Sequence, residues 1–133
     1  MKSSSIGIVL AVWLATVTAF AAEIEGVKLA DKVQLDGTEL VLNGAGVRTR
    51  LFFRVYVGAL YLQQKTSAAA AVLADTGPRR VAMHMLREVS GERLYAGLED
   101  GVKSNYTPEQ VAGFGQQLSQ FADIFRAVKV AKN

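Results

Sequence analysis

Three arginines, Arg48, Arg50 and Arg54, interrupt an otherwise apolar segment of β-forming residues in the first half of the chain. A guanidinium group stays charged at physiological pH, and on an apolar strand it needs an anion or an acidic partner to neutralise it. Arg48 also follows a turn-forming triplet, Gly44-Ala45-Gly46. Arg48 is therefore a candidate anchor for the acidic group of a ligand. Arg50 and Arg54 fit better as solvated charges paired with Asp or Glu, and the same explanation stays open for Arg48.

Two tyrosines on the same segment could assist Arg48 by donating a hydrogen bond from the phenol. Side chains an even number of residues apart share one face of a regular strand. Tyr56 has the same parity as Arg48, whereas Tyr61 has the opposite parity. The sequence therefore predicts a ligand-binding pair of Arg48 and Tyr56 and disfavours Tyr61.

Other kinds of chemistry find little support in the composition. The chain has no cysteine, so thiolate metal sites, a cysteine nucleophile and disulfides are excluded. His84 is the only histidine and is expected to be structural, because no nucleophile can be placed beside it. Gly44-Ala45-Gly46 lacks the third glycine and the following helix of a dinucleotide-binding fingerprint. We predict no cofactor and no metal. The net charge of +3 is too weak to indicate nucleic-acid binding.

The N-terminal residues have the pattern of a secretory signal peptide. Lys2 supplies a positive charge, Ile6 to Thr18 form an uncharged apolar stretch, and Ala19-Phe20-Ala21 matches a small-x-small cleavage site. An uncleaved membrane anchor is the alternative. We expect residues 1–21 to be removed and residues 22–133 to form one small domain in the periplasm or outside the cell. No second apolar stretch follows, so no membrane span is expected in the mature chain.

The remaining pattern indicates an α+β domain with an antiparallel sheet. From Val47 to Leu62 the residues alternate between two faces. The first face is almost wholly apolar and is expected to meet helices: Val47, Thr49, Leu51, Phe53, Val55, Val57, Ala59 and Tyr61. The second face is mixed: Arg48, Arg50, Phe52, Arg54, Tyr56, Gly58, Leu60 and Leu62.

Shorter signals predict the other elements. Further strands are expected at Glu23 to Leu29, Val33 to Leu42 and Arg79 to Val89, with a hairpin turn at Asp36-Gly37. Helices are expected at Ser67 to Ala74, from Ser90 to about Asn105, and from Pro108 to Val128. Thr107 and Gln110 form a capping-box pair around Pro108 at the start of the last helix. Its apolar residues lie 3 or 4 positions apart, which indicates one core-facing stripe.

Residues Leu42 to Leu62 (LNGAGVRTRLFFRVYVGALYL) resemble the chalcone-isomerase family, and especially its bacterial branch with signal peptides. The features that carry the resemblance are Gly44-Ala45-Gly46-Val47-Arg48, Leu60-Tyr61-Leu62 and Ser90-Gly91, and weaker similarity extends over residues 25 to 130. It implies an open-faced β-sandwich, with helices packed on one face of a large antiparallel sheet. Members of this family continue with further strands and helices. The resemblance therefore implies a chain truncated at its C-terminus, with an incomplete sheet and an unpaired edge.

The resemblance implies two possible activities. Plant members close a phenolate oxygen onto an enone, and Arg48 looks like their phenolate-steering arginine, with Tyr56 at the place of a threonine. Tyr95 and Asn105 are of the right type for the remaining catalytic donors, but their alignment is not fixed. Non-catalytic relatives bind fatty acids through an arginine and a tyrosine. We expect a non-catalytic binder of a small apolar acid, such as a fatty acid, with an intramolecular lyase or a structural interaction module as alternatives. The oligomeric state stays open.

Overall fold

A computed structural model of the chain describes residues 20–128. The predicted signal peptide lies outside the described residues, except that Phe20 and Ala21 form the start of strand β1 (Phe20–Ile24). The predicted mature N-terminus, Ala22, is already paired with Leu29 of strand β2 (Val27–Ala30). Export and cleavage after Ala21 stay predictions.

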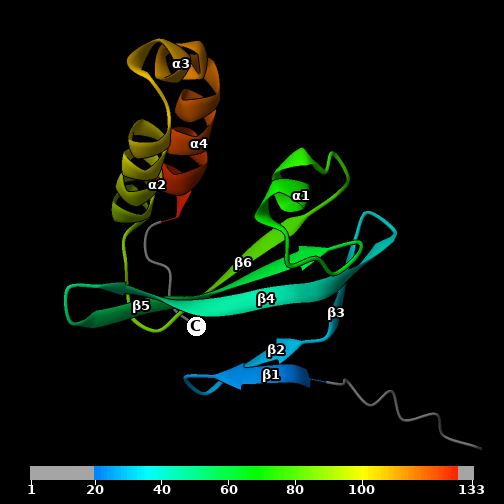
Figure 1. Cartoon of the computed structure of the whole chain (residues 1–133). Helices are drawn as coiled ribbons and strands as arrows, with labels where there is room; N and C mark the ends of the chain where they lie inside the picture. The colour runs from blue at the N-terminus through cyan, green and yellow to red at the C-terminus, as the bar shows by residue number, and fades with distance from the viewer. Residues whose placement is uncertain (1–19, 129–133) are drawn as a thin grey trace, which may run out of the picture.

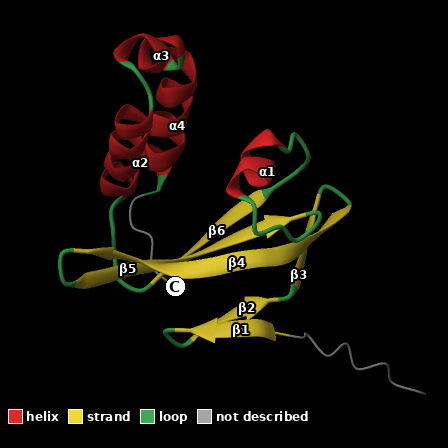
Figure 2. Cartoon of the chain, viewed as in Figure 1, coloured by secondary structure: helices red, strands yellow, loops and turns green. Residues whose placement is uncertain are grey.

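The described chain forms two antiparallel sheets and four helices, which confirms the expected α+β class. Strands β1 and β2 form a two-stranded sheet. The larger sheet has the order β3-β4-β5-β6, with the bounds Lys32–Leu35, Thr38–Arg50, Phe53–Leu62 and Arg80–Met85. The helices are α1 (Ala69–Ala74), α2 (Gly91–Asn105), α3 (Pro108–Gly113) and α4 (Gly115–Ala127). They lie on one side of the larger sheet, and β1–β2 lies on the other (Figure 1). Figure 2 shows the same separation in space, although α1 lies between β5 and β6 in the sequence.

Three tight turns set the strand boundaries. The predicted hairpin at Asp36-Gly37 is confirmed, with φ of 48° and 80° at the two residues. A similar turn at Glu25-Gly26, with φ of 52° and 77°, divides the segment that was expected to be one strand. The third turn lies at Leu51-Phe52, where Leu51 has a φ of 54°. The long alternating run is therefore wrong as a single strand: it forms the end of β4, a turn and all of β5.

A β-bulge next to this turn changes which side chains share a face. From the turn, Arg50 pairs with Phe53 and Thr49 with Arg54, but Arg48 then pairs with Tyr56, so Val55 is left over. Directly opposed residues lie on the same face of a sheet, and an extra residue reverses the alternation of its strand. Phe53 and Arg54 have therefore exchanged the faces that were predicted for them.

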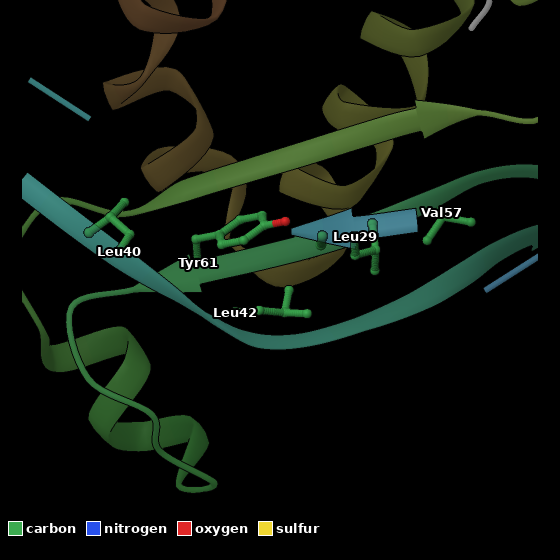
Figure 3. Close-up of a cluster of buried hydrophobic side chains, with 6 residues drawn as sticks. Leu29, Leu40, Leu42, Val57 and Tyr61 are labelled. Atoms are coloured by element: carbon green, nitrogen blue, oxygen red, sulfur yellow. The ribbon is translucent and has the colours of Figure 1, made fainter. Parts of the chain in front are cut away.

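The main hydrophobic core lies between the first face of the sheet and the β1–β2 hairpin, not between this face and the helices. Its buried members come from β2, β4 and β5: Leu29, Leu40, Leu42, Val57, Ala59 and Tyr61 (Figure 3). Side chains of the hairpin, including Ile24 and Val27, pack against this cluster. The hairpin can cover the apolar face because its own alternation places Leu29 toward the sheet.

Helices α2 and α3 start at the signals expected from Ser90 and Thr107, whereas α1 starts after Ala68 rather than Ser67, without a side-chain cap, and the long C-terminal helix is interrupted. The Ser90 side chain accepts a hydrogen bond from the Arg93 amide, and Thr107 and Gln110 form the expected capping box. The backbone leaves helical geometry at Phe114 (φ −92°, ψ 5°), between Gly113 and Gly115. Helices α2 and α4 then form an antiparallel pair, with Tyr95 against Phe125. Within residues 20–128, no helix is long and apolar enough to cross a membrane.

Candidate functional site

The structure places Arg48 and Tyr56 side by side on the second face of the sheet. Arg48 on β4 is directly opposite Tyr56 on β5, and Tyr56 is in turn opposite Met85 on β6. Directly opposed side chains have Cβ atoms about 4.5–5.5 Å apart, so the guanidinium and the phenol can reach the same small group. Arg48 is exposed, and Tyr56 is half-buried.

A row of glycines extends from this pair along the sheet. The next cross-strand set is Gly46, Gly58 and Met83, and the one after it is Gly44, Leu60 and Val81. A Cβ built on Gly44 or Gly46 would have no neighbouring atom within 4 Å, and one on Gly58 would lie 3.4 Å from the Tyr56 ring. We call the surface over Gly44, Gly46 and Gly58 the glycine trough. Next to the trough, β6 carries the exposed side chains of Val81 and Met83, so apolar groups border the trough on that side.

The three arginines have different electrostatic surroundings. Arg54 faces the β1–β2 side and forms an ion pair with Glu25 in the β1–β2 turn. That pairing agrees with the expected role of Arg54 as a surface charge. Within residues 22–128, neither Arg48 nor Arg50 has a hydrogen-bond or ion-pair partner. Arg48 is therefore an available cation beside a phenol and at the end of an apolar trough.

The other candidate donors lie elsewhere. Tyr61 is buried in the core, as its parity predicted, and cannot accompany Arg48. Tyr95 packs against Phe125 in the helical pair. The Asn105 side chain donates to the Gly101 carbonyl, at the end of α2 farthest from the sheet (Figure 1). His84 is half-buried on the core side of β6, opposite Val57, which fits the structural role expected of it.

Two hollows among the described residues lie away from Arg48. One, of about 310 Å³, is lined by Asn43, Lys65, Thr66 and Ser67. The other, of about 220 Å³, lies between the helices and is lined mainly by apolar side chains, including Leu98, Phe114 and Phe121. Among the described residues, no cluster of His, Asp and Glu could hold a metal ion. The candidate site is therefore an open sheet face with one cationic end.

Arg48 and Tyr56 were identified from the sequence, but the expected turn at Gly44-Ala45-Gly46 is wrong, because these residues continue strand β4, and the glycine trough was missed. Gly58 follows Tyr56 by two residues and Gly46 precedes Arg48 by two, so the period of a strand could have placed both beside the pair. Met83 and Val81 required the register between β5 and β6, which no local signal supplies.

Comparison with known proteins places the chain in a recognised group. A family model described as "Chalcone isomerase-like" matches residues 21–133, which include all the strands of the larger sheet and all four helices. No curated protein matches the chain. The family match includes Arg48, Tyr56 and the glycine trough.

Proposed function

This chain belongs to the chalcone isomerase-like family, and from this premise we propose that it is an exported, non-catalytic protein that binds a small apolar acid such as a fatty acid. The observation that carries the proposal is the position of Arg48. Its guanidinium has no partner within residues 22–128, lies opposite Tyr56, and stands at one end of the glycine trough. A ligand with one anionic end and an apolar body matches this distribution of charge.

Each part of the ligand has a matching part of the surface. The planar guanidinium of Arg48 can hold a carboxylate through two parallel hydrogen bonds, and the Tyr56 hydroxyl can donate a third. The apolar body would lie over Gly46 and Gly58 and cover Met83, which is 40% exposed. Removing this apolar surface from water favours binding in proportion to the area that is covered.

The arrangement supports binding better than ring closure. A lyase reaction would need donors aimed at the ketone while the arginine holds the phenolate. Tyr95 and Asn105, the residues considered for that task, make contacts within the helical pair instead. Arg48 and Tyr56 can hold an acidic group without such donors.

Arg48→Ala is expected to weaken fatty-acid binding by about 10- to 100-fold, because it removes charge-assisted hydrogen bonds. Native mass spectrometry of the protein recovered after export should show a bound fatty acid in the parent and none in the variant. Displacement of a fluorescent fatty acid then measures the change in affinity. Arg50→Ala is the matched control, since Arg50 is an exposed arginine on the same strand and face, and it should retain the ligand.

Three results would contradict this function. The first is that the protein carries no acid and binds none when one is added. The second is that Arg50→Ala weakens binding as much as Arg48→Ala does. The third is that the purified protein cyclises a chalcone at a rate that depends on Arg48. The last result would assign the site to an intramolecular lyase.

Gly46→Leu tests the apolar half of the site separately from the cationic half. A Cβ at Gly46 meets no atom within 4 Å, so the variant should fold while its side chain covers the trough. We expect at least a tenfold loss of fatty-acid affinity, with the free energy of unfolding within about 1 kcal/mol of the parent. Gly97→Leu on α2, where a Cβ also meets nothing within 4 Å, is the control for adding an apolar side chain. Unchanged affinity in Gly46→Leu would mean that the ligand does not lie over the trough.

A further inference from the structure

The turn between β4 and β5 displays three consecutive apolar side chains to solvent. Leu51 is 82% exposed, Phe52 95% and Phe53 54%. This turn forms one end of the larger sheet. It projects past β3 and β6, the strands that flank the β4–β5 hairpin (Figure 1). We call residues 51–53 the hairpin tip. Single exposed apolar residues are ordinary on a protein surface, but three adjacent ones at a projecting turn indicate an interaction site.

Basic side chains surround the hairpin tip. Residues 47–55 contain three arginines and no Asp or Glu. Arg50, directly before the tip, is exposed and has no ion-pair partner within residues 22–128. Arg87 stacks on the Phe53 ring, with its Cζ 4.3 Å from the ring centroid. Glu25 pairs with Arg54, and Glu88 follows Arg87 in the sequence, so two acidic residues accompany three arginines, Arg50, Arg54 and Arg87, at or next to the tip.

From this geometry we propose that the hairpin tip docks on an anionic lipid surface, with Leu51 and Phe52 inserted among the lipid chains and Arg50 and Arg87 against the phosphates. An apolar tip flanked by arginines has the two properties that favour binding at a membrane interface. Its apolar side chains can insert among the lipid chains, and its arginines are attracted to anionic headgroups. This proposal is independent of the ligand bound at Arg48.

The shape and charge of the tip favour a membrane over a protein partner. A projecting two-residue turn buries little area against another protein, and stable interfaces need roughly 1,000 Å² or more. Two copies meeting tip to tip would also bring the arginines of both chains together, which is unfavourable. A lipid surface demands no complementary shape and supplies the negative charge.

Vesicle flotation of the protein recovered after export tests the proposal. The protein should bind vesicles that contain phosphatidylglycerol, bind pure phosphatidylcholine much more weakly, and dissociate from the anionic vesicles as salt rises. Phe52→Ser should weaken binding at least tenfold, because the inserted ring is lost. Arg50→Gln should weaken binding to anionic vesicles about fivefold. Leu73→Ser is the control for removing an exposed apolar side chain, since Leu73 on α1 is as exposed as Leu51, at 82%, and lies outside the tip; it should not change vesicle binding.

A fluorescent reporter gives a second measurement. In Phe52→Trp, emission should shift to the blue on anionic vesicles and be quenched by brominated lipid chains, relative to the parent protein. The proposal is overturned by an absence of binding to anionic vesicles, or by binding that Phe52→Ser leaves unchanged. It is also overturned if the tip instead joins two copies, seen as a concentration-dependent mass that Phe52→Ser abolishes.

Discussion

Gly91→Ala is expected to destabilise the protein by about 3 kcal/mol, at the upper end of the cost of overpacking. A Cβ at this position would lie 1.8 Å from the Phe125 carbonyl oxygen and 2.4 Å from that of Val128. Both are backbone atoms, so a side-chain rotation cannot relieve the clash. The Gly91 amide also donates to the Val128 carbonyl over 3.1 Å. Alanine would therefore push the start of α2 away from the end of α4 and weaken this hydrogen bond.

Chemical denaturation followed by circular dichroism measures this loss, and Gly97→Ala is its control. Gly97 lies in the same helix, but a Cβ there meets no atom within 4 Å. Alanine has the higher helix propensity, so Gly97→Ala should stabilise the protein by about 0.5–1 kcal/mol. The two glycine-to-alanine changes should thus have opposite signs. Equal effects would show that α2 and α4 do not meet at Gly91.

Elements with strong local signals could be predicted from the sequence. Asp36-Gly37 favours the positive φ values of a two-residue hairpin, and Thr107, Pro108 and Gln110 satisfy the requirements of a helix start by themselves. These features need no distant partner. The family resemblance then identified the sheet-and-helix class that the family match supports.

Features that depend on distant partners could not be predicted. Leu51 and Phe52 are not turn-forming residues, so nothing local reveals that the chain reverses there. The partner of the apolar face was also misjudged, because alternation shows that a face is buried but not what covers it. Arg54 was predicted to share a face with Arg48, which is wrong. The bulge at Val55 that separates them arises only when β4 and β5 pair, so the sequence of one strand does not reveal it.

The pairing of Arg48 with Tyr56 depends on this bulge. Counting from the turn, a regular hairpin would continue from Thr49–Arg54 to Arg48–Val55, and Tyr56 would then face the core beside Val47. The extra residue moves Tyr56 opposite Arg48. Arg48 and Tyr56 are therefore neighbours on one face, as predicted, although they lie on two paired strands and not on the single strand that the prediction assumed.

Leu29→Ala is expected to cost about 2–5 kcal/mol of stability, the range for leucines in well-packed cores. Leu29 is fully buried and belongs to β2, and it is the part of the β1–β2 hairpin that lies within the main cluster (Figure 3). Truncation removes buried apolar surface and leaves a cavity between the two sheets. Because β1–β2 carries Glu25, its loosening should also release Arg54 from its ion pair.

Denaturation and hydrogen exchange should distinguish this effect from a general loss of apolar surface. Leu73→Ala, at a position 82% exposed, is expected to change stability by less than about 0.5 kcal/mol. In Leu29→Ala the amides of β1 and β2 should exchange faster, whereas fatty-acid affinity measured on the folded protein should stay near the parent value. That separation follows from the topology, because β1–β2 covers the core face and Arg48 and Tyr56 occupy the other face. A loss of affinity as large as that of Arg48→Ala would mean that the two faces do not act independently.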